Sequence, residues 1–361
     1  GSVKSAQTTL ILTEGDSAKA MAVAGIGVLE NGRKLYGIFP LRGKLRNDRN
    51  LNAEEASKNE ELTNIKRIMG LREGAEYIQA GGIGRVKEIH AWTNRPVWPQ
   101  APEIIARPTE KMDVPSHLDW DSFIGPAPMR PYHSCYTPFN WRGWLDYGTG
   151  ALGDMACHTT NLAFMGCGLT QPTKIESVNT GPINDETFPS WATVHMHFPK
   201  TEMGGAIKFN WYEGKIGNNG KDNKGIKNLP PLDYFHGEAP KNSGLLLIGT
   251  DGTVYSPNDY GSDWKVFKGG KWYKKDEVEK PSPTLPRNGR GDNGMKEELV
   301  KAIRENDPKI AMSNFDYAGN MTESLGSMKN MMSSFADNMM ENLNSVFTKF
   351  GNIGATAQFL G

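Results

Sequence analysis

The chain has 361 residues, and its 41 lysines and arginines are balanced by 41 aspartates and glutamates. This length allows two or three domains with cores of their own, while the balanced charge excludes a strongly basic nucleic-acid-binding protein. No apolar run reaches the about 20 residues that a membrane span requires. Three cysteines without C-x-x-C spacing exclude a disulfide framework and a zinc site, so we expect a cytoplasmic protein.

Residues 1–74 have the pattern of a small α/β fragment. An apolar run at residues 9–12 predicts a buried strand. The polar residues that follow can cap a helix over the alanine-rich stretch 18–24. A second apolar group follows at 36–39, and the charged stretch 53–69 is helix-prone.

Two motifs in this fragment carry chemistry. Residues 14–18 read Glu-Gly-Asp-Ser-Ala, and residues 40–44 read Pro-Leu-Arg-Gly-Lys. At this separation, the two motifs resemble the start of the metal-binding TOPRIM region of type IIA DNA topoisomerases. The resemblance implies a Mg²⁺ ligand at Glu14, because hard cations prefer carboxylate oxygens. It also implies DNA contacts at Arg42 and Lys44.

The remaining parts of a topoisomerase do not follow this fragment. The family has a D-x-D-x-D cluster shortly after this point, but none follows Leu71, and the domains with the catalytic tyrosine and the ATPase site are missing as well. A single carboxylate does not hold a two-metal site, so Glu14 and Asp16 can equally be solvated helix-capping groups. We therefore do not expect DNA as a partner, and a topoisomerase fragment carrying a passenger domain is the alternative function.

From about residue 75 the pattern changes to strands. Several segments alternate between apolar and polar residues, as half-buried strands do. Asp251-Gly252 marks the turn of a hairpin, and a helix is predicted over 295–305. We therefore predict an α+β domain over 75–325 with a large, mostly antiparallel open sheet. The strand segments are 85–92, 191–198, 206–211 and 245–255.

Three motifs in this domain point to one family. Residues 81–84 read Gly-Gly-Ile-Gly, residues 139–144 read Phe-Asn-Trp-Arg-Gly-Trp, and residues 148–158 read Gly-Thr-Gly-Ala-Leu-Gly-Asp-Met-Ala-Cys-His. These motifs resemble the C-terminal substrate domain of the Gfo/Idh/MocA oxidoreductases. The resemblance implies an NAD(P)-dependent oxidoreductase acting on a sugar or polyol, with His158 as general acid/base and Asp154 orienting it or binding substrate hydroxyls.

The spacing of Asp154 and His158 agrees with such a role. Residues four apart share one face of a helix, and a histidine near a carboxylate can take a proton from a hydroxyl group. Aromatic faces can stack on sugars, and polar side chains can bond their hydroxyls, although Trp141 can equally be a core or interface residue. The expected substrate-binding residues are Tyr132, His133, Asn140, Trp141 and Arg142.

The cofactor part of such an enzyme is not evident in the sequence. Family enzymes bind NAD or NADP at a G-x-G-x-x-G turn between a strand and a helix, and we find no such turn. We therefore expect the cofactor site to be absent and the chain to be inactive alone, so whether it is an enzyme stays open. A third hypothesis gives the N-terminal fragment a nucleotide-binding role. We also expect a homo-oligomer formed through the open sheet.

Residues 326–361 show a third composition and resemble no family known to us. A methionine-rich stretch at 328–350 carries apolar residues at helical spacing, which predicts an amphipathic C-terminal helix followed by a loose tail. The residues at this spacing are Met331, Phe335, Met339, Leu343 and Phe347.

Overall fold

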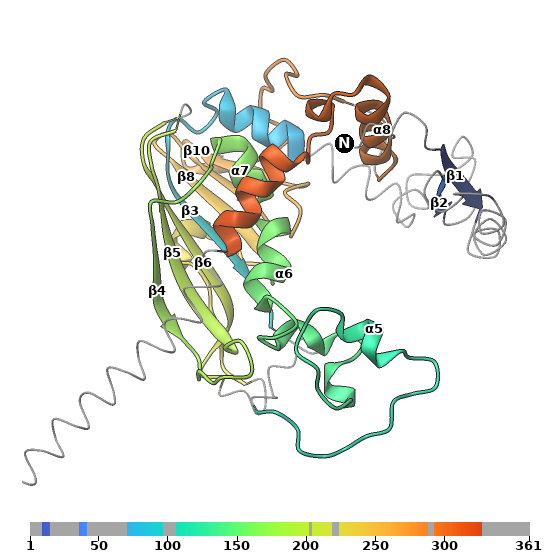
Figure 1. Cartoon of the computed structure of the whole chain (residues 1–361). Coiled ribbons are helices and arrows are strands. Elements are labelled where there is room, and N and C mark those ends of the chain that lie inside the picture. The colour runs from blue at the N-terminus through green and yellow to red at the C-terminus, as the bar shows by residue number, and fades with distance from the viewer. Residues whose placement is uncertain are drawn as a thin grey trace, which may run out of the picture. The chain divides into compact units, whose positions relative to one another are not determined.

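The computed structural model describes residues 9–14, 36–41, 71–96, 106–201, 204–218, 224–287 and 292–326. Its contacts divide the chain into two units, Gly1–Glu60 and Glu61–Gly361 (Figure 1). The boundaries near 74 and 326 that the sequence suggests therefore stay a prediction. The methionine-rich segment after residue 326 lies outside the described residues.

The first unit contains a pair of parallel strands, β1 (Thr9–Glu14) and β2 (Tyr36–Leu41), in the register Thr9↔Tyr36. Strand β1 was predicted from its apolar run at residues 9–12, whereas the apolar group at 36–39 was not assigned to a strand from the sequence. The Asp16 cap and the DNA-contact residues Arg42 and Lys44 lie outside the described residues.

The second unit is built on a nine-stranded sheet in the order β11-β10-β9-β8-β3-β6-β5-β4, with β7 paired to β6. Its described strands are antiparallel except for the neighbours β3 and β6, which are parallel. The predicted large, mostly antiparallel sheet is thus confirmed. The strands are β3 (Val86–Thr93), β4 (Lys174–Thr180), β5 (Trp191–Phe198), β6 (Ile207–Ile216), β7 (Ile226–Lys227), β8 (Gly244–Gly249), β9 (Thr253–Ser256), β10 (Lys265–Lys268) and β11 (Lys271–Lys274).

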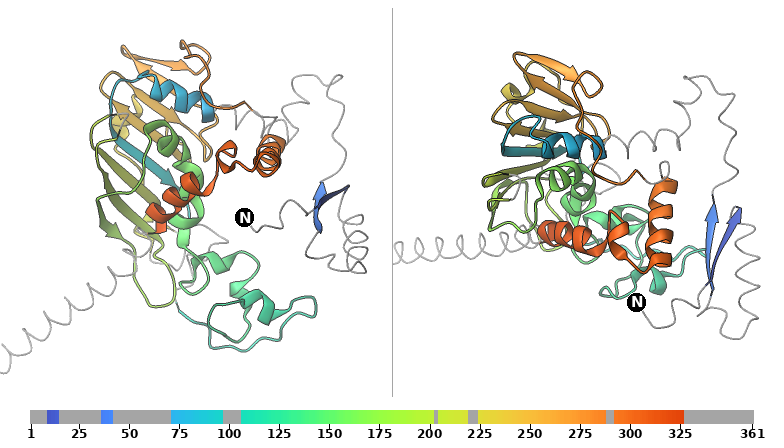
Figure 2. Two further views of the ribbon diagram at one scale, coloured as in Figure 1. Left: turned by 45° about the horizontal axis from the view of Figure 1, so that its top comes forward. Right: turned by 90° about the horizontal axis from the view of Figure 1, so that it is seen from above.

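Helices cover one face of this sheet, as Figure 2 shows from two directions. Two unlabelled helices lie at residues 71–79 and 315–326. The helix predicted at 295–305 is present and begins three residues earlier, at Asp292. The labelled helices are α5 (Trp120–Ile124), α6 (Gly150–Thr159), α7 (Asn161–Cys167) and α8 (Asp292–Glu305), with 3₁₀ turns η3 (Ser134–Tyr136), η4 (Asn140–Gly143), η5 (Leu232–Phe235) and η6 (Pro308–Ile310).

Strand β6 shows why the sheet has two different faces. Successive side chains of a strand point to opposite faces, so Ile207, Phe209 and Trp211 lie buried in the core under the helices. Lys208 and Asn210 belong to the other face, which we call the outer face. The main core is therefore a layer of apolar side chains between the sheet and the helices.

The outer face carries a polar row across four neighbouring strands. In register, Glu176 of β4 lies beside His195 of β5, then Asn210 of β6 and His90 of β3. We call these four residues the outer row. Beyond them, a loop that contains η5 covers the face with an aromatic cluster that includes Trp92, Phe235, Leu246 and Tyr255.

No helix among the described residues is long and apolar enough to cross a bilayer.

Candidate functional site

Glycines bring the η4 turn against the start of α6. A methyl group at Gly148 would lie 2.2 Å from the carbonyl oxygen of Arg142, so this close approach of two backbones requires glycine. Gly150, at φ +65°, starts α6 in a left-handed conformation, and a methyl group there would meet Phe188 at 2.8 Å. The glycine-rich motif therefore places the side chain of Arg142 beside the first turns of α6.

Arg142 and Asp154 form the charged centre of this region. The guanidinium Nε donates to Oδ1 of Asp154 at 3.1 Å, and the two side chains are 26% and 28% exposed. The same guanidinium lies over the ring of Trp141, 4.6 Å from its centroid, and over that of Phe139 at 5.4 Å. A partly exposed ion pair is thus flanked by two aromatic faces, an arrangement that suits contacts between a cation and aromatic rings.

His158 lies one turn further along α6 and is exposed. Its ring contacts Tyr260 edge to face, with the centroids 5.5 Å apart. Asp154 and His158 are thus on one helix, as the spacing predicted, but the partner that the structure gives to the carboxylate is Arg142. Burial, and then the neighbouring Asp154 carboxylate, raise the pKa of the Cys157 thiol, which makes it a poor nucleophile.

Tyr132 and His133 take part in a small second core. Tyr132 is 8% exposed and packs edge to face against Trp120, with ring centroids 5.2 Å apart. Nδ1 of His133 accepts a hydrogen bond from the backbone N–H of Cys135 at 3.1 Å and so caps η3. Both side chains already have packing or capping partners, whereas Asn140 is partly exposed at the start of η4.

Phe139 and Tyr260 are two site neighbours that the sequence did not indicate. Phe139 is 50% exposed and is the first residue of the motif at 139–144, so its place in the motif was an available signal, although it was not among the predicted site residues. Tyr260 lies about 100 residues along the chain from His158, and only the fold brings their rings together. Asn161 accepts a hydrogen bond from the hydroxyl of Tyr317, again across a long sequence separation.

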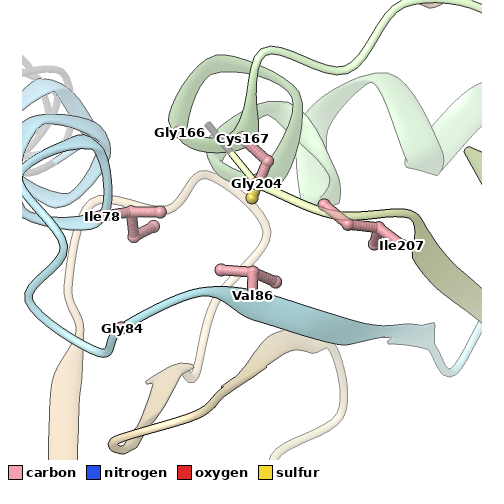
Figure 3. A pocket seen from close by; sticks show the side chains of 7 residues that line it. All are labelled: Ile78, Gly84, Val86, Gly166, Cys167, Gly204 and Ile207. Atoms are coloured by element: carbon pink, nitrogen blue, oxygen red, sulfur yellow. The ribbon is translucent and has the colours of Figure 1, made fainter. Parts of the chain in front are cut away.

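A pocket lies elsewhere in the second unit and is apolar (Figure 3). It opens at the beginning of β3 and β6, between the helix at 71–79 and the end of α7. Burial raises the pKa of its Cys167 thiol to about 12. With no ionisable group that could act on a substrate at neutral pH, this pocket does not serve as a catalytic site. Its lining residues are Ile78, Gly84, Val86, Gly166, Cys167, Gly204 and Ile207.

No metal centre is formed by the residues that the structure describes. In this part of the chain, no group of three or more His, Cys, Asp or Glu side chains could hold an ion. Glu14 ends β1, where only its backbone is described. The sequence-based Mg²⁺ prediction at Glu14 therefore gains no support.

The segment that contains most of this site matches a known family. Residues 104–216 match the family model described as "Oxidoreductase family, C-terminal alpha/beta domain", GFO_IDH_MocA_C2. This segment is therefore similar in sequence to the Gfo/Idh/MocA family. It contains Arg142, Asp154 and His158, so the charged centre and the exposed histidine lie inside the matched region.

Another part of the chain matches DNA topoisomerases. DNA topoisomerase 2 of Pisum sativum is 54% identical over 77 residues, which are 21% of this chain and 5% of the relative. The putative mitochondrial enzyme of Caenorhabditis elegans is 64% identical over 64 residues, 18% of this chain and 5% of the relative. The chain spans about 5% of the length of these relatives. It therefore contains segments that are similar to two different families.

Solved oxidoreductases are similar to the chain at low identity. Levoglucosan dehydrogenase in complex with NADH and levoglucosan is 15% identical, with a TM-score of 0.39, covering 75% of this chain and 63% of that protein. An oxidoreductase domain protein from Kribbella flavida is 14% identical, with a TM-score of 0.43, covering 90% of this chain and 78% of that protein.

Proposed function

We propose that residues 75–325 are the substrate domain of an NAD(P)-dependent oxidoreductase that acts on a sugar or polyol. The observation that carries the proposal is the Arg142–Asp154 pair beside the Trp141 ring, within the matched segment 104–216. A hydroxyl-rich ligand needs donors and acceptors for its hydroxyls and an apolar face for its C–H bonds. This site offers both.

Each residue of the site has a distinct part in this proposal. The Asp154 carboxylate accepts from substrate hydroxyls, the Arg142 guanidinium donates to them, and Trp141 stacks on the ring. The exposed imidazole of His158 takes the proton of the hydroxyl that is oxidised, as a general base. Asn140 supplies a further hydrogen bond, and Tyr132 and His133 support the site through the core and cap in which they lie.

The family match supports NAD or NADP as the cofactor, but the described residues of the second unit do not fit a dinucleotide. Their glycine turn at 81–84 leads from a helix into β3. This is the reverse of the strand–turn–helix order that presents backbone N–H groups to a pyrophosphate. We derive no hydride step from these residues and expect calorimetry with NADH or NADPH to show no saturable binding. Micromolar binding would contradict this and assign a cofactor site to other residues of the chain.

The carbohydrate proposal is tested by titrating the full chain with hexoses, inositols and an anhydrosugar, following tryptophan indole N–H signals by NMR. We expect saturable shifts for at least one ligand, and at least about tenfold weaker binding, about 1.4 kcal/mol, for Trp141→Ala and Arg142→Ala. Lys271→Ala, on the distant edge strand β11, is the matched control and should bind normally. Equal affinity of Trp141→Ala and the unmodified chain would refute this site.

We further propose that the chain forms a homo-oligomer through the outer face of the sheet in a reducing cytoplasm. The exposed part of the outer face carries Lys174, Glu176 and His197, whose side chains are 63%, 39% and 39% exposed. Such a surface can form hydrogen bonds and ion pairs with a second copy. The three cysteines are free, which agrees with a reducing compartment.

An alternative function is favoured by the identity of 54% to a topoisomerase over 77 residues. Under this alternative, Arg42 and Lys44 contact DNA while Glu14 binds Mg²⁺. Fluorescence anisotropy with duplex DNA tests it, with Arg42→Ala/Lys44→Ala as the comparison. A loss of binding in this variant would favour the alternative, whereas equal weak binding by both proteins would reflect non-specific contacts.

A further inference from the structure

A buried arginine joins two segments behind the η4 turn. Arg130 belongs to the loop between α5 and η3, and its side chain is only 4% exposed. Its Nη2 donates to Oδ2 of Asp146, and its Nη1 lies 3.0 Å from Oε2 of Glu186. A charge this deeply buried requires partners that replace the water it has lost. One cation is thus shared by two carboxylates that are distant in the sequence.

Aromatic residues of the second core fix the position of this guanidinium. The centroids of the neighbouring rings are 5.1 Å (Tyr147), 5.6 Å (Trp144) and 5.8 Å (Tyr136) from its central carbon. The backbone of Arg130 is held as well, since its carbonyl oxygen accepts from the indole N–H of Trp120 at 2.7 Å. The cation therefore has a defined place between the two segments.

The same two segments connect the elements that carry the sugar site. The N–H of Leu145 donates to the carbonyl of Glu186, and the N–H of Phe188 donates to the carbonyl of Gly143, both at 2.9 Å. Gly143 ends η4, while the ring of Phe188 lies against Gly150, where α6 begins. The paired segments thus join η4 to α6, and these two elements carry the charged centre of the site.

The charge of Arg130 stabilises this junction. Without the guanidinium, Asp146 and Glu186 would be left as two neighbouring carboxylates, and like charges repel at short range. Arg107 also pairs with Glu186, at 2.8 Å, but its side chain is 54% exposed, so solvent screens this pair. The buried cation is therefore the stronger link between the two segments.

We propose that Arg130 is a positioning residue for the sugar site, which keeps Arg142 within hydrogen-bonding distance of Asp154. It acts through η4 and does not itself contact the sugar. Loss of its guanidinium lets η4 move away from α6, which lengthens the 3.1 Å contact between Arg142 and Asp154. The effect on sugar binding rests on the proposed function, whereas the effect on this ion pair does not.

NMR of the full chain without sugar tests the positioning directly. The Nε–H of Arg142 gives its own proton–nitrogen signal, which is assigned by its loss in Arg142→Ala. Because this group donates to Asp154, we expect slow exchange with water, and Arg130→Met should speed the exchange at least about tenfold. Asp146→Asn removes a partner that is 32% exposed, so it perturbs the fold less and should act in the same direction.

Two controls separate positioning from a general loss of stability. Arg107→Met removes the exposed partner of Glu186 and should leave the exchange unchanged. Ile124→Ala shortens a buried apolar side chain of the second core, so it should lower the midpoint of urea unfolding but keep the slow exchange of Arg142. Equally fast exchange in Ile124→Ala and Arg130→Met would overturn the proposal, as would unchanged exchange in both Arg130→Met and Asp146→Asn.

A sugar titration distinguishes this inference from the proposed function. We expect Arg130→Met to bind sugar at least about tenfold more weakly, while Arg107→Met binds as the unmodified chain does. Fast exchange in Arg130→Met, together with no sugar binding by the unmodified chain, would refute the proposed function and support the positioning of the ion pair. Sugar binding of equal affinity by Arg130→Met and the unmodified chain would refute the role of Arg130 in the site.

Discussion

Two buried glutamates show how neighbouring groups decide the charge of a side chain. Glu76 is 4% exposed, and burial opposes its ionisation. Hydrogen bonds from Arg287 and from the N–H groups of Leu285 and Thr284 outweigh this and lower its pKa. Glu213 is also buried, and the indole N–H of Trp211 donates a hydrogen bond to its carboxylate at 2.8 Å. This single hydrogen bond does not offset the effect of burial, which raises the pKa of Glu213 to about 8. Glu213 is therefore protonated at neutral pH.

The raised pKa of Glu213 predicts a pH dependence of stability. Between about pH 4.5 and pH 8, the folded state keeps the proton that the unfolded chain has lost. The free energy of unfolding therefore falls as the pH rises through this range, by at most about 5 kcal/mol. Glu213→Gln removes this dependence and should stabilise the protein more at pH 9 than at pH 5.

Urea unfolding at both pH values measures the effect, and Glu297→Gln, at an exposed position of α8, serves as the comparison. An unchanged pH slope in Glu213→Gln would show that the carboxyl is ionised in the folded protein.

At the scale of elements, ion pairs attach α8 and the preceding loop to the helix at 71–79. The Arg72–Glu298 pair is buried, whereas Lys280 and Glu73, 2.9 Å apart, are 33% and 23% exposed. Removing one partner of a buried pair leaves an uncompensated charge, which costs far more than loss of an exposed pair.

Arg72→Met should therefore lower the stability of the α8 attachment by about 3–5 kcal/mol, and Lys280→Met by at most about 1 kcal/mol. Hydrogen exchange of the α8 amides measures both changes. Equal losses in the two variants would mean that the buried pair contributes no more than the exposed one.

The elements also show what local sequence can predict. The alternation in β5 and β6 and the Asp-Gly turn between β8 and β9 follow from neighbouring residues, and the structure confirms these elements. The parallel pairing of β3 with β6 could not be predicted, because it joins strands more than 100 residues apart. The inward face of α8 could not be predicted either. The apolar pattern of the helix favours burial of Met295, Leu299 and Ile303, but the structure exposes these residues.

At the scale of the whole molecule, the outer face of the sheet determines association in our proposal. His90 is 2% exposed, and burial, followed by repulsion from Lys208 and His195, lowers its pKa to about 3. His90 is thus neutral, whereas Lys208 on the same face carries a positive charge. Glu88 and Lys208 are register partners on neighbouring strands.

Lys208→Glu should dissociate the proposed oligomer, because it places two carboxylates side by side on the outer face of each copy, so that the two faces repel each other. Analytical ultracentrifugation at several concentrations measures this, and Lys271→Glu at the sheet edge should behave as the unmodified chain does. A monomeric unmodified chain at micromolar concentration would refute the interface.

The sequence by itself determined the two family segments, the alternation of the large sheet and the placement of Asp154 and His158 on one helix. These features depend on motifs and on the periodicity of neighbouring residues, which a single chain displays directly. Only the tertiary structure decided that Asp154 pairs with Arg142, that His158 lies against Tyr260 and that Glu213 is buried next to Trp211. Partners and burial depend on contacts between distant residues, and these contacts set the charge and reach of each group.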